Sequence, residues 1–211
     1  TERNIVGANI TSFSIFAPLG AVADNTPPVL TITNPENNSL INRTWVNVTL
    51  QSNEDLANAI LSWNGVNESM LGSGKTWYLN KTALSDGVYS YQAYGNDTSS
   101  NWNSTGVRYL TIDTVLPAYS NVGENRTSVR VGESVDVHAY WHDLHLSHAW
   151  LETNQTIDGV NFWHTAADIQ LNHDDWSNFT IVATEDDAGK TICWKIHAND
   201  TAGNANVTPM H

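Results

Sequence analysis

The fold of this chain is decided by residues 86–101, which read DGVYSYQAYGNDTSSN. In the first half of this stretch Tyr89, Tyr91 and Ala93 alternate with polar residues, and this period of two is typical of a β-strand with one buried face. A run of Gly, Asn, Asp and Ser follows, which is the composition of a turn. Similar short alternating stretches fill the chain, and no stretch of 12 residues keeps a helical period. The sequence therefore predicts an all-β protein.

The turn is repeated once along the chain. Residues 95–101 (GNDTSSN) match residues 198–204 (ANDTAGN), 103 positions later. Linkers that contain proline, DNTPP at 24–28 and DTVLP at 113–117, precede the two copies. This repeat predicts two tandem β-sandwiches, with domain 1 at residues 27–115, domain 2 at residues 116–211, and an extended N-terminal segment with its linker at residues 1–26.

Strands at a spacing of about 8–12 residues, separated by turn residues, are typical of a sandwich. In the first domain we expect strands at 29–33, 44–51, 59–64, 76–79, 87–94 and 106–112. In the second we expect them at 128–131, 134–141, 148–152, 179–183 and 190–198, with a truncated last strand at 206–208.

Composition narrows the choice of partners. The chain has 9 basic and 22 acidic residues, a net charge of −13, which argues against nucleic acid and against an anionic membrane surface. Cys193 is the one cysteine, so no intramolecular disulfide can form. No run of 18 apolar residues occurs, which predicts no membrane span in this chain. The first residues lack the layout of a signal peptide, so we expect a processed chain or one without its leader.

Acceptor sites for N-linked glycans (Asn-x-Ser/Thr sequons) are unusually dense. The 25 asparagines and 39 serines and threonines would give about 4 to 5 sequons by chance, whereas the chain has 13. Turn chemistry alone does not require a hydroxyl two residues after asparagine. The density predicts a glycosylated and therefore extracellular protein. The 13 candidate sites are Asn9, Asn37, Asn42, Asn47, Asn67, Asn80, Asn96, Asn103, Asn125, Asn154, Asn178, Asn199 and Asn206.

Two stretches carry a family resemblance. Asp86-Gly87-Val88-Tyr89, with Trp63 on the strand that would be strand C, resembles the tyrosine corner and core tryptophan of immunoglobulin-like (Ig-like) domains. Residues 187–193 (DAGKTIC) resemble the D-x-G-x-Y-x-C signature of the same domains, with Thr191 in the tyrosine position and Trp150 as the strand-C candidate. Both domains lack the strand-B cysteine, so the inter-sheet disulfide is missing.

The combination of proline linkers, NDTAGN turns and dense sequons also resembles the tandem Ig-like repeats of archaeal cell-surface and S-layer glycoproteins. This resemblance covers about residues 24–208. It implies an extracellular, cell-surface location, and it says little about activity.

Candidate metal and catalytic residues are few. Asp97 and Asp200 in the repeated turns are predicted to close Asx turns, and calcium binding is the alternative. All eight histidines lie beyond residue 137. The candidates for a zinc or copper site are His138, His142, His145 and His148, with scattered surface histidines as the alternative. No nucleophile elbow, zinc-protease motif or phosphate-binding loop occurs, so we expect no enzyme activity and no cofactor, with calcium left open.

The N-terminal segment offers a mode of assembly. Residues 9–22 (NITSFSIFAPLGAV) alternate, and an apolar face without a partner forfeits roughly 1.5–3 kcal/mol of burial for each large side chain. The segment is expected to dock into its own first domain, or into a neighbouring subunit as a donor strand, for which the truncated end of domain 2 would provide an acceptor groove. The candidate donor residues are Ile10, Phe13, Ile15, Ala17 and Leu19.

Two hypotheses follow for function. In the first, the chain is a structural subunit of an extracellular, glycosylated filament or surface layer, with itself as partner in a head-to-tail homopolymer. In the second, it is a non-polymerising adhesin or ligand-binding fragment of a larger archaeal cell-surface protein. The two differ in their assembly state.

The sequon density generates a direct prediction. Mass spectrometry of peptides from native protein should find most of the 13 sites occupied, because sequons that fall on turns and solvent-facing strand positions are accessible to the glycosylation machinery. Fewer than four occupied sites would contradict the extracellular assignment.

Overall fold

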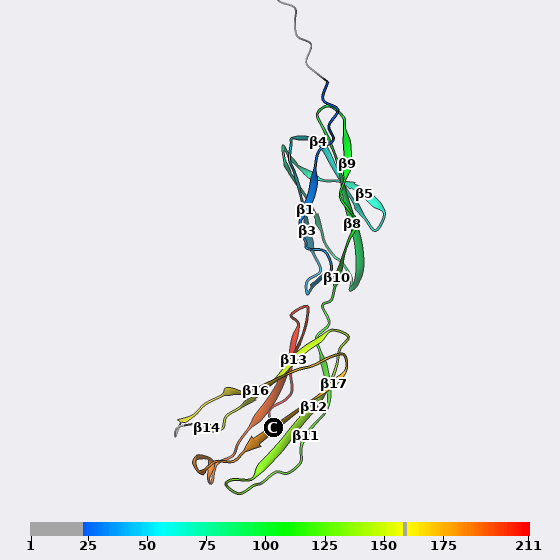
Figure 1. The fold of residues 1–211 in the computed structure, drawn as a ribbon. Coiled ribbons are helices and arrows are strands. Elements are labelled where there is room, and N and C mark those ends of the chain that lie inside the picture. Colours follow the sequence, from blue (N-terminus) through cyan, green and yellow to red (C-terminus); the bar gives the residue numbers. More distant parts are fainter. Residues whose placement is uncertain (1–22, 158–159) are drawn as a thin grey trace, which may run out of the picture.

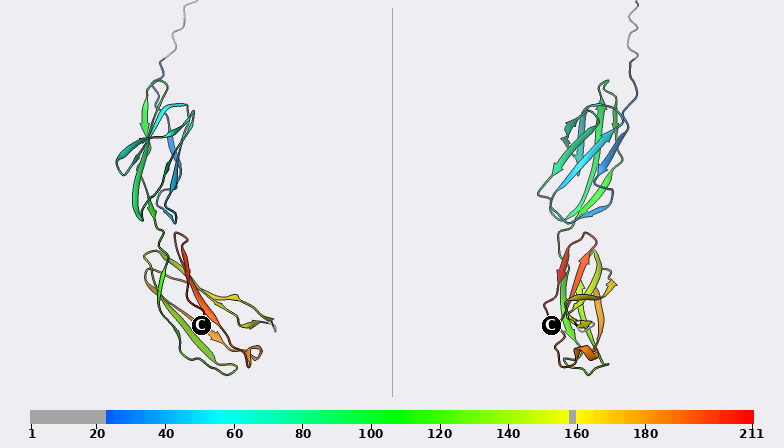
Figure 2. Two further views of the ribbon diagram at one scale, coloured as in Figure 1. Left: turned by 180° about the vertical axis from the view of Figure 1, so that it is seen from behind. Right: turned by 90° about the vertical axis from the view of Figure 1, so that its left-hand side faces the viewer.

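The computed structural model describes residues 23–157 and 160–211. The chain folds into two β-sandwiches that lie end to end, and the described chain begins at the outer end of the first one (Figures 1 and 2). The predicted all-β fold is confirmed, since helical structure in these two ranges is limited to one 3-10 turn, η1 (Glu185–Asp187). None of the described chain forms a helix that is long and apolar enough to span a membrane.

The first sandwich packs two sheets against each other. One sheet has the strand order β1-β3-β7-β6, and the other has the order β2-β10-β8-β4-β5 with β9 also paired to β8. Strand β8 lies within residues 86–101. The bounds are β1 (Leu30–Asn34), β2 (Ser39–Ile41), β3 (Val46–Ser52), β4 (Leu56–Trp63), β5 (Val66–Ser69), β6 (Leu71–Ser73), β7 (Thr76–Lys81), β8 (Gly87–Asp97), β9 (Trp102–Ser104) and β10 (Arg108–Ile112).

An aromatic cluster marks the core of the first sandwich. Trp63 is buried, and its ring centroid lies 5.9 Å from that of Tyr91 and 5.3 Å from that of Tyr89. The Tyr89 hydroxyl donates a hydrogen bond of 2.8 Å to the carbonyl of Ser85, four residues upstream. This geometry confirms the tyrosine corner and the core tryptophan that the sequence predicted.

The second sandwich is built from a three-stranded sheet, β11-β12-β17, and a four-stranded sheet, β16-β13-β18-β19. A short hairpin, β14-β15, lies beside them. The bounds are β11 (Ala118–Glu124), β12 (Ser134–His142), β13 (Leu146–Thr153), β14 (Thr156–Ile157), β15 (Val160–Asn161), β16 (His164–Gln170), β17 (Asp175–Val182), β18 (Trp194–Asp200) and β19 (Ala205–Val207).

The core tryptophan of the second sandwich is not the predicted one. Ala149 and Leu151 occupy the inward positions of β13, so the strand alternation turns Trp150 to the outer face. There its ring stacks on His197 at a centroid distance of 4.9 Å. Trp141 on β12 fills the core instead, fully buried, and its indole N–H donates to the Ser177 hydroxyl at 3.1 Å.

Strand prediction failed at several places in this sandwich. Strand β11 starts directly after the linker that ends at Pro117, whereas no strand was expected before residue 128, and β16 has no counterpart among the expected strands. Residues 128–131 were expected to form a strand and do not, and β18 begins at Trp194 although a strand from residue 190 was expected. Residues 128–131 and 190–193 lie on two sides of one opening in the sandwich.

The loop between β17 and β18 is held by one buried carboxylate. Asp187 accepts hydrogen bonds from the backbone N–H groups of Thr184 (2.9 Å) and Thr156 (3.0 Å), from the Thr184 hydroxyl and from the Gln155 amide. Burial alone would raise the pKa of Asp187, but these hydrogen bonds outweigh it and lower the pKa from 3.8 to about 2. The charged carboxylate is therefore the form that stabilises the loop.

This lowered pKa predicts an acid-sensitive second sandwich. An aspartate whose folded pKa lies below its unfolded value contributes stability that is fully present above about pH 4 and is lost as the pH falls towards about 2. In Asp187→Asn, the free energy of unfolding at pH 7 should fall by about 1–3 kcal/mol, because two backbone N–H groups lose a charged acceptor. Its further decline between pH 4 and pH 2 should be shallower than in the wild type. Urea unfolding followed by tryptophan fluorescence measures both effects.

The neighbouring Asp186→Asn is the matched control, because Asp186 is exposed. This variant should keep the wild-type stability and pH dependence. An Asp187→Asn protein that loses stability with acid as steeply as the wild type would contradict the role assigned to this carboxylate.

Candidate functional site

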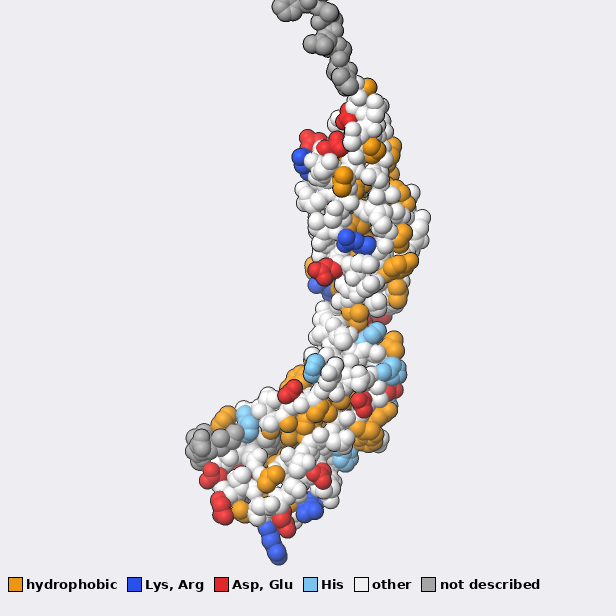
Figure 3. Space-filling model, viewed as in Figure 1, with side chains coloured by type: hydrophobic (Ala, Val, Ile, Leu, Met, Phe, Trp, Pro, Cys, Tyr) orange, Lys and Arg blue, Asp and Glu red, His pale blue; other side chains and the backbone are white. Residues whose placement is uncertain are grey.

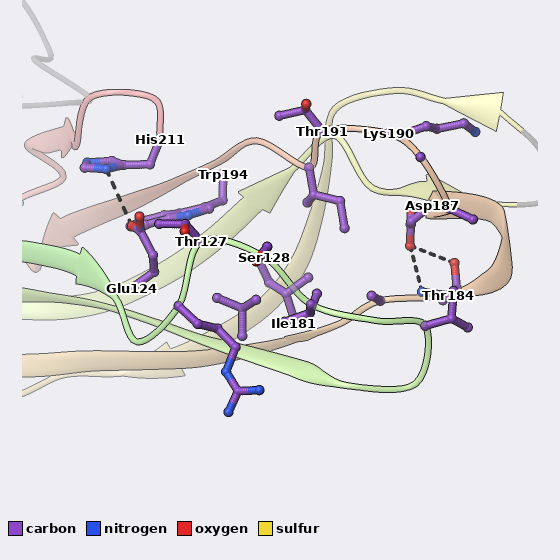
Figure 4. Close-up of a pocket in the computed structure, with 18 residues that line it drawn as sticks. Glu124, Thr127, Ser128, Ile181, Thr184, Asp187, Lys190, Thr191, Trp194 and His211 are labelled. Carbon is purple, nitrogen blue, oxygen red and sulfur yellow. Dashed lines mark hydrogen bonds and ion pairs between the residues drawn. The ribbon is translucent and has the colours of Figure 1, made fainter.

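A groove of about 380 Å³ opens in the second sandwich (Figure 4), at the end that is farthest from the linker in Figure 1. Glu124, Trp194 and His211 lie at one end of it, and Thr184 and Asp187 lie at the other. Its apolar lining comes from both sheets, with Val135 and Ile181 on one side and Ile192 and Trp194 on the other. We call this feature the open groove.

The end of the groove at His211 is held by hydrogen bonds and by ring stacking. Trp194 and His211 exchange two backbone hydrogen bonds of 3.0 Å, and their rings stack at a centroid distance of 4.5 Å. The His211 Nδ1 atom lies 3.8 Å from a carboxylate oxygen of Glu124. Pairing along this edge of β18 therefore continues from β19 as far as the pair Trp194–His211.

The first sandwich shows what occupies the corresponding place. Thr105 accepts a hydrogen bond from the N–H of Ala93, and Thr208 accepts the same bond from Ile196, each at 3.0 Å, so residue 105 corresponds to residue 208. Strand β10 begins three residues after Thr105 and pairs antiparallel with residues 87–91 of β8 and parallel with β2. The second sandwich has no counterpart of β10 within the ranges 23–157 and 160–211.

In the first sandwich β10 is a core strand. Its residues Leu110 and Ile112 are each 1% exposed and lie in the same cluster as Trp63 and Tyr91. The open groove occupies the corresponding position, between residues 128–131 and residues 190–193, which match β2 and the first part of β8 in chain order. Both segments lack a strand partner in the described structure, and this explains why two expected strands did not form. The groove thus has the apolar lining expected at a position for one β-strand, and the segments on both sides of it are not in strands.

The predicted donor residues Ile10, Phe13, Ile15, Ala17 and Leu19 lie outside the described residues, as does the sequon at Asn9. Of the other sequons, Asn96 is buried at 6% exposure, and its amide nitrogen donates to the carbonyl of Asp97. This position is closed to a glycan in the folded chain. Four asparagines are half-buried, namely Asn47, Asn154, Asn199 and Asn206. Seven are exposed, namely Asn37, Asn42, Asn67, Asn80, Asn103, Asn125 and Asn178.

Four sequons belong to a ten-residue repeat, NDTxxNxNxT, at residues 96–105 and 199–208. In each copy the aspartate binds the asparagine four residues later through its carboxylate: Asp97 binds Asn101, and Asp200 binds Asn204. This arrangement confirms that the two aspartates close turns. Because the Thr105 and Thr208 hydroxyls also bind backbone, asparagine and threonine have structural tasks in this repeat.

The same repeat anchors each linker to the domain that follows it. In the first sandwich Asn101 donates to the carbonyl of Asp24 and Asn103 to that of Pro28. In the second, Asn204 donates to Asp113 and Asn206 to Pro117, at 2.8 and 2.9 Å. The turn and the linker are therefore one unit, which we call the linker clamp.

The four candidate histidines lie in different surroundings. His138 packs edge-on against Trp176, His142 contacts Ser120 and Asp174, and His148 contacts Ser147. The Nδ1 atom of His145 lies 2.6 Å from Oδ2 of Asp113, beside the linker clamp. Ligand atoms of His145, Asp113 and Asp143 lie within 4.8 Å of one another, as do those of Asp24, Glu54 and Asp97 at the corresponding end of the first sandwich. Burial, together with the charges of Asp113 and Asp200, raises the pKa of Asp143.

The sequence matches no protein-family model and no curated protein. Among solved structures, the fibronectin(III)-like modules of CbhA from Clostridium thermocellum superpose with a TM-score of 0.57 at 12% identity, covering 86% of this chain and 91% of that one. The chicken CNTN1 FN1–FN3 domains give 0.44 at 10% identity, covering 89% of this chain and 68% of theirs. A tetra-tandem repeat from the extending region of a large adhesion protein gives 0.35 at 16% identity, covering 87% of this chain and 48% of that one.

The first of these likenesses is close enough to decide the fold. Together with the tyrosine corner and the two packed sheets of each sandwich, it shows that this chain is an all-β protein with the sandwich fold of tandem fibronectin III and Ig-like modules.

Proposed function

We propose that this protein is a structural subunit of an extracellular, glycosylated filament or surface layer, in which the N-terminal strand of one subunit fills the open groove of the next. The role is structural and involves no catalysis. The observation that carries the proposal is the open groove together with the two segments beside it, neither of which belongs to a strand. An inserted strand would pair with the backbone groups that these segments leave without a partner.

The chemistry of the groove fits the N-terminal segment. Strand β10 places two aliphatic side chains, two residues apart, into the equivalent core position. Residues 13–19 offer Phe13, Ile15, Ala17 and Leu19 with the same period of two. Burying each large apolar side chain is worth roughly 1.5–3 kcal/mol, so such a strand adds side-chain burial to a ladder of backbone hydrogen bonds.

The geometry favours donation between subunits. The described chain begins at the outer end of the first sandwich, and the open groove lies at the opposite end of the second (Figures 1 and 2). The first described residues therefore lie far from the groove of their own chain. A contact between opposite ends of identical subunits is head-to-tail, and it propagates into a fibre unless the rotation closes a ring.

The exterior suits a cell surface. The net charge of −13 keeps such a chain soluble, and seven sequon asparagines are exposed in the described structure. The resemblance to the tandem Ig-like repeats of archaeal surface glycoproteins supports the same location. Hydrophobic side chains nevertheless reach the surface of both sandwiches (Figure 3). Exposed apolar surface is typical of interaction sites, so the adhesin function is the competing hypothesis.

Removal of residues 1–22 should abolish polymerisation and leave a soluble two-domain monomer, because the donor is lost while both sandwiches remain. Light scattering and electron microscopy measure the assembly state. A synthetic peptide of residues 9–22 should raise the melting temperature of the truncated protein by filling the open groove, whereas a scrambled peptide should not.

Two point variants separate the donor strand from other uses of the N-terminus. Ile15→Asp puts a charge on the apolar face and should block assembly, whereas Ser14→Asp puts the same charge on the opposite face and should permit it. If the truncated protein still forms the same filaments, or the full chain is a stable monomer at high concentration, donor-strand assembly is excluded and the adhesin hypothesis replaces it.

A further inference from the structure

An aromatic platform lies on the outer face of the second sandwich, away from the open groove. Trp176 on β17 is 42% exposed, and its ring centroid lies 5.0 Å from that of Tyr140 and 5.6 Å from that of His138 on the paired strand β12. These neighbours hold the indole in place from one side and leave part of it facing solvent. A large, fixed and exposed aromatic surface is a favourable place for a ligand with an apolar face.

A sequon asparagine follows on the same face. Asn178 comes two residues after Trp176 in β17, and alternate residues of a strand share a face at about 3.3 Å per residue. Asn178 is exposed and lies directly opposite His138 in the β12–β17 pairing. The hydroxyl of its sequon partner Thr180 donates to Asp136 at 2.8 Å, so the third residue of the sequon also lies on this outer face.

The amide of Asn178 differs from the amides of the linker clamp. Asn103 and Asn206 donate their side-chain nitrogen to linker carbonyls. Asn178 makes no side-chain hydrogen bond within residues 23–157 and 160–211, so the atom that would carry a glycan is free and points away from the core. This sequon has no structural task that would explain the asparagine.

We propose that Asn178 carries an N-linked glycan whose first sugars lie flat on the Trp176 indole. A pyranose ring has a face made of C–H groups, and laying that face on an exposed aromatic ring removes apolar surface of both from water. The glycosidic link to Asn178 keeps the sugar close to the ring, so little entropy is lost on contact. This inference rests on the glycosylation that the proposed function assumes.

The same arrangement occurs once more, on β7 of the first sandwich. Tyr78 is 41% exposed and comes two residues before the exposed sequon residue Asn80. Aromatic residues make up 9% of the chain, yet they stand two positions before four of the 13 sequons. In the other two cases, Trp45 before Asn47 and Tyr94 before Asn96, the asparagine is partly or fully buried. The pattern therefore leaves one exposed aromatic–sequon pair on each sandwich.

The experiment compares melting temperatures of the full chain, produced in a host that attaches N-glycans, in four forms: wild type, Asn178→Gln, Trp176→Ala and the double variant. Loss of the glycan in Asn178→Gln should lower the melting temperature of the second sandwich by about 3–6 °C. In the Trp176→Ala background the same substitution should change it by less than about 1 °C. Trp176→Tyr, which keeps an aromatic face, should retain most of the shift.

Asn67→Gln is the matched control, because Asn67 is an exposed strand sequon with Gly65 in place of the aromatic residue. Removing that glycan should leave the melting temperature unchanged. Equal shifts for Asn178→Gln with and without Trp176 would overturn the inference. So would an empty Asn178 in a protein whose other sequons are occupied, and this result would leave the extracellular assignment intact. A protein with no glycan at any site would overturn both.

Discussion

A β-strand is stable only where its backbone N–H and C=O groups find partners, and this requirement organises both sandwiches. In the first one β10 supplies partners to β2 on one side and to β8 on the other, and its side chains fill the space between the two sheets. In the second sandwich the equivalent strands pair in the same way as far as Trp194 and His211. Residues 128–131 and 190–193 belong to no strand in the described structure, and the open groove lies between them. This groove is the basis of the proposed function.

The linker clamp explains how each linker is fixed to the domain that follows it. A buried aspartate binds the asparagine four residues later, and two asparagine amides of the same turn then bind carbonyls of the preceding linker. Each of these hydrogen bonds contributes about 0.5–1.5 kcal/mol, and the buried ones cost more when one partner is lost. Because every residue of this unit lies either in the turn or in the linker of the same module, each copy fixes its linker independently.

The linker clamp also offers a second explanation for some of the sequons, because their asparagines serve the fold. In NDTxxNxNxT the four sequon asparagines bind backbone through their side chains, and Asn37, Asn125 and Asn154 do so elsewhere. Seven of the 13 sequons therefore contain an asparagine with a structural contact. The exposed sequons on strand faces, such as Asn67, Asn80 and Asn178, have no such reason. The number of sequons by itself therefore does not measure glycosylation, because some of these asparagines are needed for the fold.

The sequence by itself determined the fold class, the tyrosine corner at Tyr89, the core position of Trp63 and the turns at Asp97 and Asp200, because alternation, turn composition and short motifs act over a few residues. It did not determine which tryptophan fills the second core, since Trp141 and Trp150 both lie on strands and only packing decides which one faces inward. Nor did it single out Ile181, Ile192 and Trp194 as the lining of a groove. The composition of residues 128–131 and 190–193 is a local property that favours strands. Whether those strands form depends on a partner from elsewhere, and this only the tertiary structure could decide.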